Sequence, residues 1–190
     1  MTDGCTAKPV DKTIDLLVLG LGNVLLGDDG LGAAAVARVE RDYYVPPGVR
    51  LVDGGTLGLS LLDLLTDSHH VILVDAVRTD GPPGTLVRLD GADVMDAVRD
   101  RLSPHQVGVA DLLDAARLID SYPTAVTLLG LVPDAIDLAV ARSSAVEGGL
   151  DELVSAIVRE VQSLGYQMVR QPETSGRHRP IHDLTRHFGM

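Results

Sequence analysis

Hydrophobic and polar residues follow one another in blocks that predict alternating strands and helices. Three continuous apolar runs predict strands that are buried on both faces: Ile14–Leu19, His70–Val77 and Ala125–Val132. Val49–Val52 predicts a further short strand, and the alternating pattern of Thr85–Leu89 predicts an edge strand that could run antiparallel to its neighbour. The chain therefore contains enough strands for one central sheet.

Apolar residues at helical spacing separate these strands. The predicted helices cover Asp29–Tyr43, Leu57–Leu65, Ala92–Leu102, Ser103–Ile119 and Ser144–Leu164. Strands that alternate with helices are typical of an α/β fold, in which helices cover both faces of a mostly parallel sheet. We therefore expect three layers, helix on sheet on helix.

The chain has 190 residues, a length that fits a single domain. Residues 1–13 are polar and are expected to form an N-terminal arm. Residues 14–166 carry the strand and helix pattern and are expected to form the α/β domain. Residues 167–190 contain four Arg against two acidic residues, which predicts a basic, flexible C-terminal tail.

Charge and composition exclude several classes of partner. Lys and Arg total 16 against 27 Asp and Glu, so the net charge is −11, which argues against nucleic acid and anionic membranes as partners. The one cysteine, Cys5, rules out a disulfide within the chain and fits a reducing compartment. No apolar run is long enough for a membrane span or resembles a leader, so a cytoplasmic protein is expected.

The segment Gly20–Gly32 follows a predicted strand and precedes a helix, which is where dinucleotide-binding turns occur. The G-x-G-x-x-G fingerprint fails at Leu25, although Asp53 stands where a ribose-binding acid would lie. Asp28 and Asp29 near the helix start would disfavour a phosphate and favour a cation. We expect Asp28 to be the helix N-cap and Asp29 to point toward the strand ends.

Two further residues complete a candidate site. Asp75 lies at the end of a predicted central strand, where a carboxylate needs a cation, a metal or local N–H groups as partners. His105 lies in the first turn of a helix that Ser103 and Gln106 would cap, a position that favours neutral imidazole. Asp29, Asp75 and His105 together would offer two carboxylates and one imidazole, a set suited to Zn, Ni or Mn.

The chain contains six segments in this order: LVLGLGNVLLGDDGLG (17–32), VDGGTLGLSLLDLL (52–65), VILVDAV (71–77), PPGTLVRL (82–89), SPHQVGVADLL (103–113) and TLLGLVP (127–133). Together they resemble the hydrogenase maturation endopeptidases of [NiFe] hydrogenases. The resemblance covers residues 14–165 and implies a twisted five-stranded sheet between helices.

The resemblance also implies an activity and a site. Members of this family remove a C-terminal extension from the hydrogenase large-subunit precursor after nickel has been inserted. By motif position, Asp29, Asp75 and His105 are expected to be both the catalytic and the metal-engaging residues, with nickel supplied by the substrate or another divalent ion in its place. The D-G-G-T motif, Asp53, Gly54, Gly55 and Thr56, is expected to contribute to substrate binding. The resemblance further suggests a monomer.

Two alternatives remain at this level. A Rossmann-type nucleotide-binding protein would bind NAD or another nucleotide. A non-cleaving chaperone would bind the large subunit without hydrolysing it.

Overall fold

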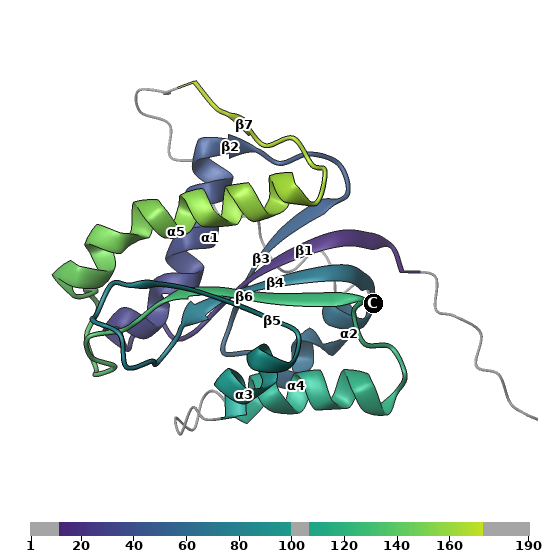
Figure 1. Cartoon of the computed structure of the whole chain (residues 1–190), viewed down its shortest axis with the longest axis horizontal. Coiled ribbons are helices and arrows are strands. Elements are labelled where there is room, and N and C mark those ends of the chain that lie inside the picture. The colour runs from purple at the N-terminus through teal and green to yellow at the C-terminus, as the bar shows by residue number, and fades with distance from the viewer. Residues whose placement is uncertain (1–11, 100–106, 173–190) are drawn as a thin grey trace, which may run out of the picture.

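Five strands form one sheet in the order β3-β1-β4-β6-β5 (Figure 1). The computed structural model describes residues 12–99 and 107–172. The sheet strands are β1 (Ile14–Leu21), β3 (Val49–Gly55), β4 (Ser68–Ala76), β5 (Leu86–Asp90) and β6 (Ala125–Leu131). Neighbouring strands among β3, β1, β4 and β6 are parallel, whereas β5 pairs antiparallel with β6 at the edge. The predicted sheet and its antiparallel edge strand are confirmed.

Residues 16–21 of β1 and 71–74 of β4 are apolar because both faces of these strands are covered. Leu16 and Val18 of β1 pack in a cluster with α1 and α5, whereas Leu17 and Leu19 pack in a second cluster with the helices of the opposite face. All four side chains are fully buried. Continuous burial of this kind is expected for a central parallel strand.

Helices cover both faces of the sheet, so the predicted three-layer α/β architecture is confirmed (Figure 1). One face carries α1 (Leu31–Asp42) and α5 (Ser144–Ser163), and the other carries α2 (Leu62–Thr66), α3 (Ala92–Arg99) and α4 (Val107–Leu118). Short 3₁₀ helices, η1 (Gly27–Gly30) and η2 (Gly58–Leu61), precede α1 and α2. No helix in residues 12–99 and 107–172 is long and apolar enough to cross a membrane.

The chain after α5 folds back onto the domain. Strand β7 (Val169–Arg170) pairs antiparallel with β2 (Tyr43–Tyr44), and Met168 is buried in the cluster formed with α1 and α5. Gln171 donates through its backbone N–H to Asp42 O at 2.7 Å. Residues 167–172, which the sequence assigns to the tail, therefore pack against the end of α1. Residues 1–11 of the expected arm and 173–190 of the expected tail lie outside the described residues.

Candidate functional site

Parallel strands bring the candidate acids to one edge of the sheet. Gly32, in the first turn of α1, lies so close to the ends of β1 and β4 that a Cβ there would be 2.3 Å from both Leu21 O and Val74 O. This close approach sets the start of α1 on the carboxyl ends of two neighbouring strands. Asp29, three residues before Gly32, and Asp75, directly after Val74, are thereby placed at the same edge, as the sequence predicts.

Asp29 has a buried carboxylate, and only one of its two oxygens has a hydrogen-bond partner among the described residues. Its side chain lies in η1 and is 1% exposed. Oδ2 accepts a hydrogen bond from Asn23 N at 2.7 Å, whereas Oδ1 is buried and has no partner among the described residues. The loop folds back tightly here, because Gly22 has φ +106° and a Cβ there would lie 1.8 Å from Asp29 O. A buried polar atom without a partner is costly, so the unpartnered Oδ1 distinguishes Asp29 from an acid with a purely structural role.

Asp28 has the same burial but a full set of partners. Its carboxylate accepts backbone N–H bonds from Ser143 at 2.6 Å, Asp134 at 2.9 Å and Ala135 at 3.3 Å. Burial alone would raise the pKa of Asp28, but these donors stabilise the charged form and the pKa lies below its usual value. Asp28 therefore ties the loop 132–143 to the segment that carries Asp29.

The expectation that Asp28 is the N-cap of the first helix is wrong. The 3₁₀ turn Gly27–Gly30 delays the start of α1 to Leu31, so the N-cap is Gly30, which has no side chain to form a capping bond. Asp28 precedes that position and its side chain points to another loop instead. Nothing in the local sequence indicates Ser143 as its partner, because the two residues are 115 positions apart.

Asp75 is the penultimate residue of β4 and is 2% exposed. Its Oδ1 accepts a hydrogen bond from Ala76 N at 2.7 Å. Side chains alternate along a strand, so Asp75 shares a face with Val71 and Leu73, which pack in the cluster that contains α4. Asp75 is therefore directed to the α4 side of the sheet.

The D-G-G-T motif lies at the end of β3, beside the loop of Asn23. Asp53 is exposed, and its Oδ1 accepts a hydrogen bond from Gly55 N at 3.1 Å, while Gly55 O accepts one from Gly22 N at 3.1 Å. Gly54 is buried and Thr56 is exposed. This motif is thus joined through Gly22 to the loop that holds Asp29.

His105 lies outside the described residues, as do Ser103 and Gln106 of the expected capping box. The described part of α4 begins at Val107, and Gly108 packs against Gly58, just after the D-G-G-T motif. Within residues 12–99 and 107–172 no group of three or more His, Cys, Asp or Glu could hold a metal ion. The predicted set contains only two described members, so it stays a prediction.

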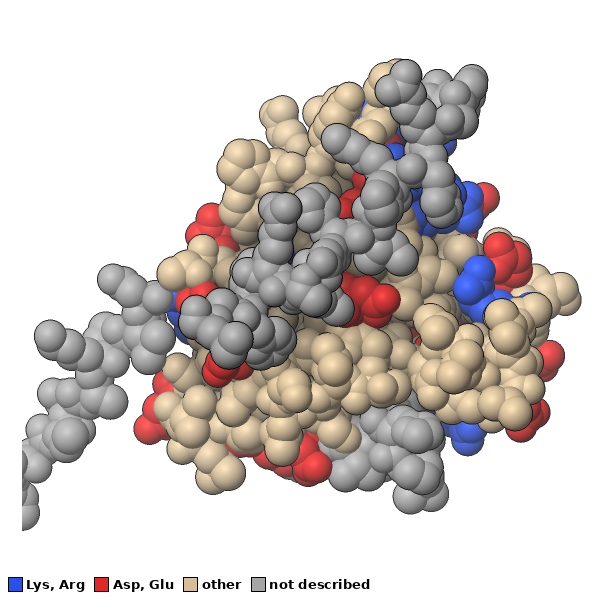
Figure 2. Space-filling view, turned by 180° about the vertical axis from the view of Figure 1, so that it is seen from behind, with Lys and Arg blue, Asp and Glu red and all other residues tan. Residues whose placement is uncertain are grey.

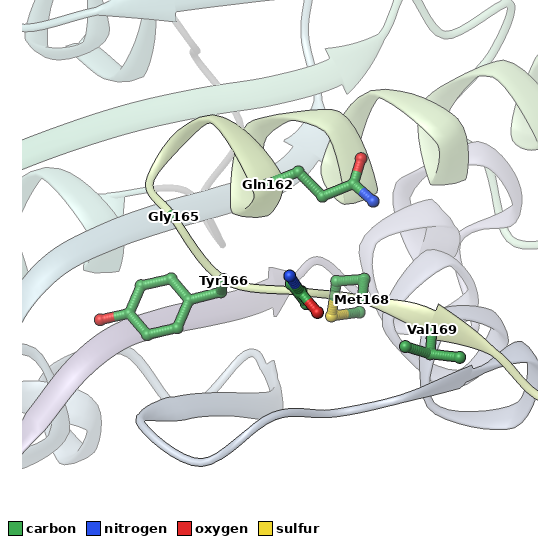
Figure 3. A pocket seen from close by; sticks show the side chains of 6 residues that line it. Gln162, Gly165, Tyr166, Met168 and Val169 are labelled. Atoms are coloured by element: carbon green, nitrogen blue, oxygen red, sulfur yellow. The ribbon is translucent and has the colours of Figure 1, made fainter.

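A shallow pocket of about 420 Å³ lies elsewhere, at the end of α5, and Gln162, Tyr166, Met168 and Val169 are among its lining residues (Figure 3). It adjoins the amino end of the sheet: a Cβ on Gly48 would lie 3.2 Å from Tyr166 Cε1, and Gly48 O accepts from Leu16 N near the start of β1. Its lining contains no carboxylate or imidazole. Its position and lining separate it from the candidate site.

Acidic side chains are scattered among uncharged ones on the coloured part of the face seen in Figure 2. The candidate acids Asp29 and Asp75 are instead buried at the sheet edge.

The fold and the edge carboxylates define a class: an α/β protein whose mostly parallel sheet carries buried acids at its carboxyl edge. Comparison with known proteins identifies the family. The sequence profile of the hydrogenase maturation proteases matches residues 33–160. The chain belongs to this family and is a peptidase. The nucleotide-binding alternative is thereby set aside.

Relatives match over most of their length. Hydrogenase 2 maturation protease of Escherichia coli K12 is 32% identical over 155 residues, which cover 81% of this chain and 94% of the relative. The hydrogenase expression/formation protein HupD of Rhodobacter capsulatus is 37% identical over 164 residues, 85% of this chain and 78% of the relative. The solved structure of the hydrogenase maturating endopeptidase HybD from E. coli aligns with a TM-score of 0.79 at 31% identity and covers 83% of this chain and 98% of that one.

Proposed function

We propose that this peptidase removes a C-terminal extension from the large-subunit precursor of a [NiFe] hydrogenase after nickel has been inserted. Relatives named as hydrogenase maturation proteases support the reaction class and the kind of substrate. The observation that carries the proposal is the buried Oδ1 of Asp29, which no described residue engages, at the edge that also holds Asp75. A folded protein retains such an atom at a cost, and a substrate-borne cation would offset that cost.

Asp29, Asp75 and His105 are the proposed residues that engage the nickel held in the precursor. Two carboxylates and one neutral imidazole suit a divalent ion of this type, and other divalent ions would fit the same donors. The direction of Asp75 toward the α4 side supports the inclusion of His105, which precedes the described part of α4 by two residues. The role of His105 itself rests on its S-P-H-Q motif.

In this reaction the residues of the chain would bind the substrate and hold the candidate carboxylates in a fixed orientation. Asn23 N–H holds one oxygen of Asp29 and leaves the other directed to a ligand, and Ala76 N–H fixes Asp75. The low dielectric around these buried carboxylates strengthens their attraction for a cation. The exposed Asp53 and Thr56 of the D-G-G-T motif would contact the polypeptide beside them. When engaged, the substrate's nickel would supply Lewis acidity toward the scissile carbonyl or a water molecule.

A cleavage assay on purified precursor with and without nickel tests this function. Wild-type protein is expected to shorten the nickel-loaded precursor and to leave the nickel-free precursor intact. Asp29→Asn, Asp75→Asn and His105→Ala are each expected to lose cleavage, whereas Asp63→Asn, an exposed acid on α2, serves as the matched control and retains it.

Full cleavage by all three site variants would disprove the assignment of Asp29, Asp75 and His105 to the site. Cleavage that does not depend on nickel would disprove the nickel requirement, whereas the peptidase activity would still be established. Binding of the precursor without any cleavage by the wild type would instead favour the chaperone alternative.

A further inference from the structure

Large apolar side chains are exposed mainly at the carboxyl edge of the sheet. Of ten such side chains that are at least 52% exposed in the described part of the chain, six lie in segments that follow the strands at this edge, five on loops and one in η2. They are Val24, Leu25, Leu57, Leu59, Leu138 and Val140. Exposed apolar residues scattered singly need no explanation, but a group of them beside a candidate site indicates an interaction surface.

Four of these residues lie on two loops that are bonded to each other. Ala139 donates through N–H to Leu25 O at 3.1 Å and accepts at its C=O from Gly27 N at 2.7 Å. In this parallel bridge, which pairs Leu26 with Ala139, Leu138 lies opposite Leu25 and Val140 lies opposite Gly27. Val24 precedes Leu25 on the first of the two loops. We call Val24, Leu25, Leu138 and Val140 the docking patch.

The docking patch is held firmly although its side chains face solvent. Asp28 binds the N–H groups of Asp134 and Ser143, at the two ends of the loop that carries Leu138 and Val140. The bridge at Ala139 fixes the middle of the same loop. Leu138 is 86% exposed and Val140 is 84% exposed on this anchored backbone. A fixed apolar surface binds a partner without the entropic cost of ordering a loop.

The patch continues directly into the site. Asn23, next to Val24, donates its N–H to Asp29, and Asp28 joins the second loop to the same segment. The docking patch therefore adjoins the segment that carries Asp29. The charges beside the patch are acidic: Asp134 and Asp137 are exposed, and the one cation of the second loop, Arg142, is paired with Glu147 at 2.8 Å.

We infer that the docking patch binds the segment of the precursor next to its scissile bond, and that this segment carries apolar side chains with basic residues beside them. This assignment rests on the proposed function for the identity of the partner. The apolar side chains would cover the docking patch, and the basic ones would face Asp134 and Asp137. The patch would then determine which precursor is accepted, separately from the residues that engage the metal.

A binding experiment with matched double variants tests the patch. Leu138→Ser/Val140→Ser removes two apolar side chains from it, and Leu118→Ser/Ile119→Ser removes two equally apolar, exposed side chains at the far end of α4. All proteins, including the reference, carry Asp29→Asn so that the nickel-loaded precursor is not consumed. The dissociation constant is measured by titration, and unfolding in urea verifies that each variant is folded.

The patch variant is expected to raise the dissociation constant for the precursor by about tenfold or more, since burial of two such side chains contributes at least that much to affinity. The control variant is expected to leave it unchanged. Equal affinity of the patch variant and the reference, or equal loss in both double variants, would overturn the inference.

Two further outcomes can be told apart: failure of the proposed function, and self-association of the protein through the docking patch. If the wild type binds the precursor but cleaves nothing, the proposed function fails, while the ratio of dissociation constants still decides the role of the patch. If sedimentation shows that the protein self-associates and that only the patch variant is monomeric, a second copy of this chain covers the patch and the inference is wrong.

Discussion

Asp28 and Asp29 are neighbours with equally buried carboxylates, yet every oxygen of Asp28 accepts a backbone N–H whereas Oδ1 of Asp29 has no partner among the described residues. Asp28 accepts from the loop 132–143, which lies far away in the sequence. Among the described residues, the carboxylate of Asp29 accepts from Asn23, six residues earlier. One acid therefore stabilises the architecture of the edge, and the next keeps one oxygen without a described partner.

Replacing Asp28 should destabilise the protein. In Asp28→Asn one oxygen becomes an NH₂ group, which cannot accept the N–H bonds from the loop and is brought against those donors. We expect the free energy of unfolding to fall by about 2–3 kcal/mol, as measured by urea denaturation. Asp134→Asn changes an exposed side chain of the same loop and should stay within about 0.5 kcal/mol of the wild type. Equal stability of the two variants would contradict the role assigned to Asp28.

Replacing Asp29 should separate stability from activity. Asp29→Asn keeps an oxygen for Asn23 N–H and removes a buried charge whose other oxygen has no described partner. We expect the free energy of unfolding to remain the same or to rise, because the cost of burying the charge disappears. Cleavage of the nickel-loaded precursor should fall by about 100-fold or more. A marked loss of stability in Asp29→Asn would show instead that this carboxylate is structural.

The lowered pKa of Asp28 predicts a loss of stability in acid. An unfolded Asp has a pKa of about 3.9 and the folded value lies below it. The stabilisation is therefore fully present above the unfolded value and is lost as the pH falls through the folded value. Urea denaturation at a series of pH values below about 4 should show a shallower decline for Asp28→Asn than for the wild type. Parallel declines would mean that Asp28 does not contribute to acid sensitivity.

Two glycines in helices should respond oppositely to the same substitution. A Cβ on Gly32 would collide with the carbonyl oxygens of Leu21 and Val74, which belong to the backbone of the sheet and cannot move freely. Gly32→Ala should therefore cost about 3 kcal/mol or more and disturb the site edge. A Cβ on Gly148 in α5 would meet no atom within 4 Å, so Gly148→Ala should stabilise the helix by about 0.5–1 kcal/mol. Thermal unfolding of both variants provides the comparison.

The sheet could be predicted well because its signals are local. The apolar runs of β1, β4 and β6 exist because both faces of these strands are covered. In the antiparallel edge strand β5, Val87 and Leu89 are half-buried and pack against one core cluster, whereas Arg88 and Asp90 are exposed. The same pattern predicts that Asp29 and Asp75 lie at one edge, since parallel strands share a carboxyl end. The structure confirms that placement, although not their chemical roles.

Other features could not be predicted, because they depend on contacts between distant residues. The 3₁₀ turn that moves the start of α1 to Leu31 is coupled to the loop that binds Asp28, and that loop is more than 100 positions away. Strand β7 forms only because Tyr43 and Tyr44 lie where residues 169–170 return. The local sequence also does not indicate that Leu138 and Val140 are exposed, since their segment contains the same residue types as a buried strand.

The contact between Asp28 and Ser143 has a consequence for how the protein is made. Asp28 leaves the ribosome 106 residues before Asp134 and 115 residues before Ser143. Until then the N–H donors that hold the carboxylate of Asp28 in the folded protein are absent. Long-range contacts of this kind form late in folding. A chain that ends before Ser143 lacks this donor to Asp28 and also lacks α5, so it lacks contacts that hold the edge beside Asp29 in the arrangement described above.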